Sequence, residues 1–324
     1  MPPHRQTSWR GGFILQSLDI FFCQRLHIIY TSRPTMKKCK LLITLLLVAL
    51  IGVSTSFYCN HKKWKKHQCW GGYNHSDISF IKQRIAMLTA DKSILYPTHI
   101  DNEPFIFSDL MSSDTVACVT NEIGKDIYDF SNISFKEGDV VIDIGGNVGM
   151  VSIYLAKKYP FLKIYAFEPV KQNYENFKKN ITLNNIPDGI IFVEHAAVTK
   201  DGRDIRMSVD TINSGGSSIE SIDWGKQDPL SAAEEITPSI TLDQIFDKYN
   251  IQHCKLLKMD CEGSEYEILY NTTQETLKKC ENLRAEFHTN PSIAKQFGTG
   301  QQLLDFSKKH IKNVEANILG DFNY

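Results

Sequence analysis

The sequence has no C-x-x-C pair, no histidine–cysteine cluster with zinc spacing and no G-x-x-x-x-G-K-[ST] phosphate loop. These absences leave no signal for a structural zinc site or for a P-loop nucleotide site. The 324 residues also contain no internal repeat and no low-complexity tract. Hydrophobic residues make up 42% and charged residues 23% of the chain. This composition is that of a globular protein and excludes collagen, coiled coil and wholesale disorder.

Acidic residues outnumber basic ones in most of the chain. Residues 1–67 hold 11 lysines and arginines and a single acid, Asp19. Residues 68–324 hold 25 basic and 36 acidic residues. Nucleic-acid binding requires a basic surface, so the acidic body argues against a nucleic-acid partner.

Only one long hydrophobic run is present, at residues 41–58, where 18 residues carry no charge. This length is at the short end for a membrane-spanning helix. Two interpretations are open: a single-pass signal anchor, or a signal peptide that begins at Met36 and is cleaved near Ser54 or Ser56. Lysines flank the run on both sides, which leaves the orientation undecided and disfavours a buried core helix.

Both interpretations place residues 59–324 in the lumen of the secretory pathway or outside the cell. Four N-x-S/T sequons agree with this location, at Asn74, Asn132, Asn180 and Asn271. Six cysteines follow the hydrophobic run, and an even number permits disulfides in an oxidising compartment. We nevertheless predict that Cys254 and Cys261 are free buried thiols.

The chain divides into a basic N-terminal segment and a body. We predict a basic segment at 1–40, a membrane or signal helix at 41–58, a basic stalk at 59–75, an extension at 76–131 and the main domain at 132–324. Residues 1–35 lie before the alternative start. Within the extension, residues 104–119 are expected to form a strand and a turn.

The main domain alternates between strand-like and helix-like segments. Predicted strands are 140–144, 162–169, 190–198, 255–260, 283–288 and 314–318, and predicted helices are 148–158, 171–183, 242–249, 264–279 and 301–310. Such alternation is typical of an α/β fold with right-handed crossovers and a doubly wound, mostly parallel sheet. Residues 200–240 interrupt the pattern as an inserted hairpin and glycine/serine-rich loop.

A glycine-rich turn follows the first of these strands, in the sequence VIDIGGNVG at 141–149. Asp143 ends the strand, and Glu168 ends the next one, where a carboxylate can accept ribose hydroxyls. A nucleotide-type ligand is therefore expected across these strand ends. The dinucleotide fingerprint requires glycines at 147 and 150, where this chain has Asn147 and Met150.

A second polar motif, KMDCEGSE, occupies residues 258–265. On a strand, Lys258 and Asp260 point to one face. A buried lysine is rare unless it is paired, and we predict a Lys258–Glu286 pair. Asp260 stands at the carboxyl end of its strand, where it can orient an acceptor or take its proton. Other candidates are Glu262, His288 and Glu265, the last of which can instead cap the following helix.

The turn and the acidic strand end resemble motifs I and II of class I S-adenosylmethionine (SAM) methyltransferases. With AFEPV, ITLDQIF, KMDCEGSE and LRAEFH, residues 135–320 resemble the FkbM-like methyltransferase family. The resemblance implies a seven-stranded-type Rossmann-like sheet and a SAM-dependent enzyme that methylates hydroxyls of sugars or natural products. It implies SAM contacts from Asp143, Gly145, Gly146, Asn147, Gly149 and Glu168, with His195 and Ala196 near the adenine. SAM is cationic and has no phosphate, which suits the acids at 143 and 168.

The predicted activity is O-methylation of a glycan, a glycolipid or a small metabolite by in-line transfer. Asp260, Glu262 and His288 are the predicted catalytic residues. Asp260 with Glu262 or His288 can hold Mg²⁺, but the spacing requires no metal and none is predicted. The alternatives are N- or carboxyl methylation and a non-catalytic membrane-anchored scaffold. The acceptor pocket is expected from residues 200–240 and 289–300.

Overall fold

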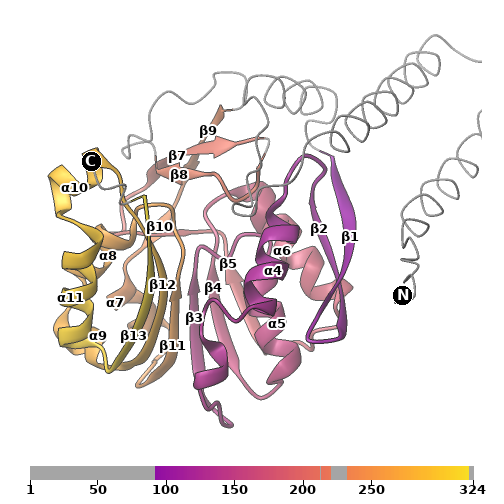
Figure 1. The fold of residues 1–324 in the computed structure, drawn as a ribbon, viewed down its shortest axis with the longest axis horizontal. Coiled ribbons are helices and arrows are strands. Elements are labelled where there is room, and N and C mark those ends of the chain that lie inside the picture. Colours follow the sequence, from indigo (N-terminus) through magenta and orange to yellow (C-terminus); the bar gives the residue numbers. More distant parts are fainter. Residues whose placement is uncertain (1–91, 212, 220–231, 321–324) are drawn as a thin grey trace, which may run out of the picture. The chain divides into compact units, whose positions relative to one another are not determined.

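The computed structural model describes residues 92–211, 213–219 and 232–320 (Figure 1). The predicted segments at 1–40, 41–58 and 59–75 lie outside these residues, as does the beginning of the extension. Among the residues described, no helix is both long enough and apolar enough to cross a membrane. The membrane or signal helix therefore stays a prediction.

A six-stranded sheet forms the centre of the described body, and every neighbouring pair in it is parallel. The order is β13–β12–β11–β3–β4–β5, so the chain builds outward from β3 and then returns to build outward from β11. This reversal is the predicted doubly wound arrangement. The strands are β3 (Val140–Ile144), β4 (Lys163–Phe167), β5 (Ile191–Glu194), β11 (Cys254–Met259), β12 (Cys280–His288) and β13 (Asn313–Leu319).

The predicted seven-stranded arrangement is wrong for this part of the chain. β12 and β13 hydrogen-bond to each other directly, from the Asn282–Asn313 pair to the His288–Leu319 pair. No further strand can lie between two strands that occupy each other's edges. The sheet over residues 140–319 is therefore fully parallel.

Most predicted strands and helices lie within a few residues of their observed positions, but two segments divide. The strand predicted at 190–198 ends as β5, and β6 (Ala197–Val198) leaves the sheet to pair with β10 (Ser239–Ile240). The helix predicted at 264–279 forms α8 (Glu265–Asn271) and α9 (Gln274–Lys278). Thr272 has an extended backbone, and the Thr273 side chain accepts a hydrogen bond from the Thr276 amide, which starts α9 anew.

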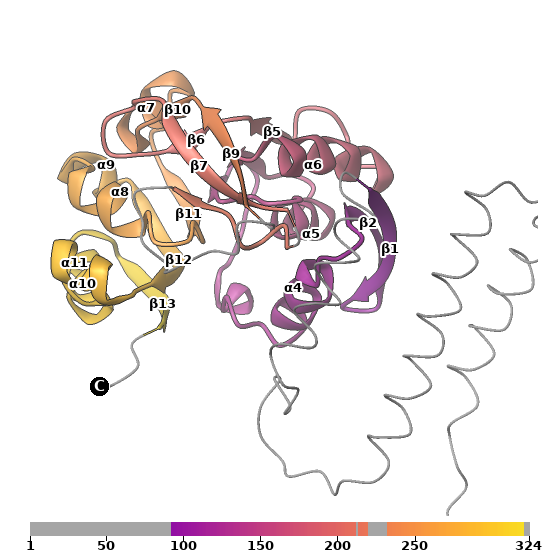
Figure 2. The same ribbon diagram turned by 90° about the horizontal axis from the view of Figure 1, so that it is seen from above.

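Helices cover both faces of the sheet (Figures 1 and 2). Successive strand residues alternate between two buried clusters, with Val141 and Ile164 in one and Ile142 and Tyr165 in the other. The first cluster packs beneath α4 (Thr115–Gly124), α5 (Met150–Lys158) and α6 (Lys171–Leu183). The second packs beneath α7 (Leu242–Lys248), α8, α9, α10 (Pro291–Phe297) and α11 (Gly300–His310).

An antiparallel hairpin of β1 (Ser93–Ile100) and β2 (Glu103–Leu110) packs against α6. The predicted strand-and-turn segment 104–119 thus holds β2, but α4 begins at Thr115. Two asparagine side chains, one in α6 and one at its C-terminal cap, make the backbone hydrogen bonds to β2 that a neighbouring strand would make. Asn184 exchanges hydrogen bonds with both backbone groups of Ile106, and Asn180 does so with Ser108. These bonds satisfy the exposed edge of β2, which an amphipathic pattern does not predict.

The insertion at 200–240 contains the predicted hairpin and one more strand. β8 (Ser218–Ile219), β7 (Ile205–Asp210) and β9 (Ala232–Thr237) form a three-stranded antiparallel sheet in the order β8–β7–β9. Figure 1 shows this sheet beyond the carboxyl ends of the central strands. Cys254 and Cys261 form no disulfide, as predicted, and neither does Cys280; Cys254 is buried as predicted, whereas Cys261 is half-buried.

Candidate active site

A cavity of about 260 Å³ opens at the carboxyl ends of β3, β4, β11 and β12. Its walls include Gly145 after β3, Glu168 after β4, Asp260 after β11, Glu286 in β12 and Ser214 of the insertion. The strand order reverses between β3 and β11, and open α/β sheets bind ligands at such a reversal. The structure therefore brings the predicted motifs together around one cavity.

The glycine turn uses all five of its backbone amides inside the protein. Those of Gly145 and Gly146 donate to the Phe167 carbonyl, and that of Gly149 donates to the Gly146 carbonyl. The Asn147 amide donates to Glu168 Oε2 over 2.8 Å, and the Val148 amide donates to Asn147 Oδ1. Phosphate cradles need amides that point at the ligand. This turn retains none for that purpose.

Close packing explains the glycines themselves. A Cβ on Gly145 would stand 1.8 Å from the Asp260 carbonyl oxygen, and one on Gly149 would stand 2.1 Å from the Phe177 ring. Both residues also have positive φ angles, of +76° and +89°. The turn can therefore lie against the end of β11 and against α6 only if these positions lack side chains.

Glu168 is 4% exposed and lines the cavity. Its carboxylate accepts hydrogen bonds from the amides of Asn147 and Val170 and from the Asn173 side chain. Burial raises the pKa of Glu168 to about 7 despite these bonds. The residue thus ties the glycine turn to the end of β4, in the position predicted for a ribose contact.

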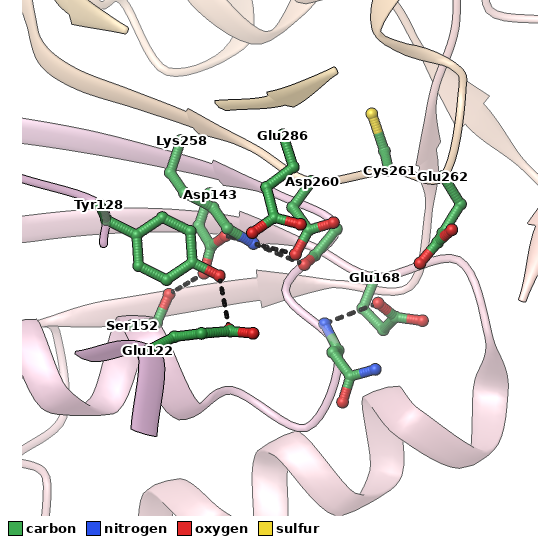
Figure 3. Close-up of polar contacts among 12 residues, drawn as sticks. Glu122, Tyr128, Asp143, Ser152, Glu168, Lys258, Asp260, Cys261, Glu262 and Glu286 are labelled. Atoms are coloured by element: carbon green, nitrogen blue, oxygen red, sulfur yellow. Dashed lines mark hydrogen bonds and ion pairs between the residues drawn. The ribbon is translucent and has the colours of Figure 1, made fainter. Parts of the chain in front are cut away.

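Lys258 lies under the turn, but its partners differ from the predicted one. Its Nζ stands 3.2 Å from Asp143, 3.8 Å from Asp260 and donates to the Gly145 carbonyl over 3.0 Å (Figure 3). Asp143 is directly opposite Lys258 across the β3–β11 pair, whereas Arg284 is opposite it in β12. Burial alone would lower the pKa of Lys258, but the charges of Asp143 and Asp260 hold it above its usual value.

Asp143 does not line the cavity. It is 1% exposed, and its second oxygen accepts a 2.6 Å hydrogen bond from Ser152 of α5. Asp143, Ser152 and Lys258 therefore form a buried support for the glycine turn. In the structure Asp143 acts on the cavity through Lys258 and the Gly145 carbonyl.

Three carboxylates crowd the side of the cavity near β11 and β12. Figure 3 shows Glu286 and Asp260 turned toward the same region, with Glu262 beyond Cys261. Burial raises the pKa of Glu262 to about 8 against the opposing charge of His288, and the Asp260 charge adds to the rise. Burial and the Asp260 charge raise the pKa of Glu286 to about 7. The region is rich in negative charge.

His288 stands behind these acids and not on the cavity wall. Its Nδ1 lies 3.2 Å from Oε1 of Glu265, which is fully buried, and its Nε2 lies 3.7 Å from Glu262. Burial alone would lower the pKa of His288, but the bond to Glu265 and the surrounding carboxylates raise it to about 10. A protonated imidazole favours a charge-balancing role over that of a base.

A family model, the methyltransferase FkbM domain, matches residues 143–310. The chain belongs to this family. The predicted resemblance is thereby confirmed, and the cavity lies within the matched region and the extension before it.

Two curated relatives of the chain are methyltransferases by name. Methyltransferase 1 of Beauveria bassiana is 23% identical over 184 residues, which cover 53% of this chain and 72% of that protein. The 31-O-demethyl-FK506 methyltransferase FkbM of Streptomyces tacrolimicus is 24% identical over 179 residues, covering 48% of this chain and 68% of that one. A SAM-dependent methyltransferase structure from Agrobacterium tumefaciens matches with 10% identity and a TM-score of 0.31, over 59% of this chain and 49% of that one.

Not all predicted cofactor residues of the FkbM domain reach the cavity. Gly145, Gly146, Asn147 and Glu168 line it, whereas Gly149, His195 and Ala196 do not. His195 stacks on Tyr174 and contacts the Pro169 carbonyl and Glu235, while the next residue but one, Ala197, lines the wall. The adenine contact predicted for His195 and Ala196 therefore stays a prediction, and neither residue lines the cavity.

The extension that precedes the FkbM domain contributes six residues to the cavity wall, none of which belongs to a predicted motif: Asp114, Thr115, Cys118, Val119, Glu122 and Tyr128. Tyr128 donates to Glu122 over 3.2 Å, and both side chains line the cavity (Figure 3). Burial and the Asp260 charge raise the pKa values of both Glu122 and Tyr128. Neither residue belongs to a recognisable motif, because α4 brings Glu122 to the site from outside the alternating pattern.

The insertion contributes a polar clasp at Ser214, another feature that the sequence did not reveal. The Ser214 carbonyl accepts hydrogen bonds from Asn147 and Asn173, and its hydroxyl donates to Asp109 over 3.0 Å. One residue thus joins the insertion, the glycine turn and β2. The clasp forms part of the cavity wall.

Proposed function

We propose that the protein is a SAM-dependent O-methyltransferase that acts on a hydroxyl of a glycan, a glycolipid or a small metabolite. One observation carries the cofactor assignment: an acidic cavity whose glycine turn offers no free amide to a phosphate. A sulfonium and an ammonium gain from carboxylates, whereas the phosphates of a nucleotide would be repelled.

The residues present fit this group. Glu168 lines the cavity and would accept ribose hydroxyls, while Lys258 donates to the Gly145 carbonyl and pairs with Asp260. SAM, when bound, supplies a methyl group that passes from its sulfur to the acceptor oxygen, leaving the carbon–sulfur electron pair on sulfur. Asp260 or Glu286 takes the proton that the acceptor hydroxyl loses. The cavity walls hold the reactants in line.

A second cavity of about 150 Å³ supports an acceptor site where the sequence predicts one. Its walls include Arg203 from the insertion and Ser292 and Phe297 from α10. Ile219 and Ser264 line both cavities, so the two adjoin. An aromatic ring beside hydroxyl, guanidinium and amide groups suits a hydroxylated acceptor.

The other transfer reactions are less well supported. A carboxylate acceptor would meet Asp260, Glu262 and Glu286, and like charges repel at such distances. A buried ion pair such as Asp143–Lys258 is costly to maintain. A non-catalytic scaffold gives no reason to keep this pair beneath a ligand cavity. For the whole chain we propose anchorage by residues 41–58 with the body in the secretory lumen, or secretion after cleavage near Ser56.

Calorimetric titration of the full-length chain with SAM tests the proposal. We expect micromolar binding, weakened about tenfold or more in Glu168→Ala because charged hydrogen bonds are lost. Glu315→Ala, at an exposed position of β13, is the matched control and should bind as the wild type does. Radiolabelled methyl transfer to alcohol, amine and carboxylate acceptors then decides the chemistry. A folded wild-type chain that binds no SAM would instead support the scaffold alternative.

A further inference from the structure

Three side chains converge at the carboxyl ends of β11 and β12, and the site described above assigns them no common ligand. Asp260 follows β11, while Glu286 and His288 lie two residues apart in β12. One ligand atom from each lies within 4.8 Å of the other two. Their side chains are 27%, 14% and 12% exposed, so the group is sheltered yet reachable from the cavity.

The histidine of this triad is held in the orientation that a metal ligand requires. Nδ1 of His288 lies 3.2 Å from Oε1 of Glu265, a side chain with no exposed surface. Nε2 then faces the acids, 3.7 Å from Glu262 and 3.9 Å from Glu286. A carboxylate that fixes the far nitrogen is the usual support of a metal-binding histidine.

Buried negative charge exceeds the cations available to it. Lys258 is the only lysine, arginine or histidine among the described residues that line the cavity, and it also serves Asp143. Oε2 of Glu265 is buried and makes no hydrogen bond within the described part of the chain. Buried charges in proteins are paired or coordinate a metal. Lys258 and His288 together face five carboxyls here, Asp143, Asp260, Glu262, Glu265 and Glu286, so the region can take up a further cation.

We propose that Asp260, Glu286 and His288 bind one divalent cation of the Mn²⁺ or Mg²⁺ type. Two carboxylate oxygens and one imidazole nitrogen suit such an ion and leave positions for water and an acceptor oxygen. His288 offers Nε2 after that nitrogen gives up its proton, while Nδ1 keeps the proton donated to Glu265. Building on the proposed function, the ion would orient the acceptor hydroxyl and make it more acidic.

Electron paramagnetic resonance of the full-length chain, stripped with EDTA and titrated with Mn²⁺ alone, tests this site. We expect one ion per chain, with affinity reduced about tenfold or more in D260N, E286Q and H288Q. Glu122→Gln is the matched control, because Glu122 lines the same cavity outside the triad. Its effect should stay within about threefold, since Glu122 influences Asp260 and Glu286 through its charge and is not one of the proposed ligands.

Pulsed measurements keep the test independent of folding. Mn²⁺ bound to the wild type should show nitrogen coupling from the imidazole, and H288Q that still binds Mn²⁺ should lose it. A folded wild-type chain without Mn²⁺ binding overturns the site, as does equal weakening by the Glu122→Gln control. SAM titration in EDTA separates the two proposals: SAM binding without Mn²⁺ binding overturns only the metal site, and Mn²⁺ binding without SAM binding overturns only the proposed function.

Discussion

Glu168 is a buried carboxylate whose contacts are hydrogen-bond donors and not a paired cation. Two backbone amides and the Asn173 side chain point at it. Burial outweighs these donors and raises its pKa from 4.5 to about 7. At neutral pH the carboxyl is therefore present in both its protonated form, which can donate a hydrogen bond, and its ionised form, which only accepts. Because the Asn147 amide donates to this carboxylate, the strength of its contact with the glycine turn depends on pH.

This coupling predicts a pH-dependent contribution of Glu168 to stability. Below pH 4.5 the carboxyl is protonated in both states, and between pH 4.5 and 7 only the unfolded chain ionises. The wild type should therefore lose stability relative to Glu168→Gln as the pH rises through this window, by about 3 kcal/mol in total. Urea denaturation of both chains from pH 4 to 8 measures the difference. A difference that stays constant with pH would contradict the assigned pKa.

Individual residue roles were predictable where they follow from position on a strand. The pattern places Lys258 and Asp260 on one face and requires a partner for the buried lysine, and the structure pairs Lys258 with both Asp143 and Asp260. The predicted partner, Glu286, was wrong, because strand register, which places Asp143 opposite Lys258, is not visible in a single sequence. Glu122 and Tyr128 were missed because they reach the cavity from a distant segment that carries no recognisable motif.

At the scale of elements, the glycine turn joins β3 to α5 and fixes where β11 can end. The Gly145 amide donates to Phe167 at the end of β4, while the Asp260 amide donates to Ile144 at the end of β3. The space for a Cβ at Gly145 is occupied by the Asp260 carbonyl. The relative position of three strand ends therefore depends on this residue.

Gly145→Ala should destabilise the fold more than its backbone angle alone accounts for. Positive φ costs a non-glycine residue about 1–2 kcal/mol, and the collision with Asp260 adds to that cost. Gly189→Ala is the control, because Gly189 has φ +85° and a Cβ there would meet no atom within 4 Å. Guanidinium denaturation should show a larger loss of unfolding free energy for Gly145→Ala. Equal losses in the two variants would mean that the turn can move away from Asp260.

Regular elements were predictable because hydrophobic periodicity and turn residues are local signals. VVIDI forms β3 over the predicted residues, and α6 spans the predicted 171–183. The breaks were not predictable: a single cap at Thr273 divides one helix, and pairing with β10 removes β6 from the sheet. The asparagine contacts between α6 and β2 likewise depend on a tertiary neighbour that periodicity does not reveal.

For the whole molecule, the alternating pattern predicted the doubly wound sheet, and the reversal of strand order then located the cavity. The alternating pattern predicted the six strands of this sheet, whereas the seven-stranded arrangement was inferred from the resemblance alone. The compartment rests on the hydrophobic run at 41–58 and on the four sequons. Of the three sequon asparagines that the structure describes, Asn132 and Asn271 are exposed and Asn180 is buried. This difference in exposure gives the compartment a direct test.

If the body lies in the secretory lumen, Asn132 and Asn271 should carry glycans and Asn180 should not. Asn132 and Asn271 are exposed, whereas Asn180 has no exposed surface, and its amide donates to the Ser108 and Val148 carbonyls. A glycan on Asn180 would remove those bonds and force α6 from β2. The test is the mobility shift on endoglycosidase treatment of the full-length chain from a secretory host, in an Asn74→Gln background.

Each of Asn132→Gln and Asn271→Gln should remove one glycan, and Asn180→Gln should leave the shift unchanged. The three variants also discriminate between kinds of failure. No shift in any of them would place the body outside the lumen and contradict both the anchor and the cleaved-signal interpretations. A shift lost only in Asn180→Gln would keep the lumenal placement but require α6 to separate from the β1–β2 hairpin, because the side chain cannot be modified and buried at once.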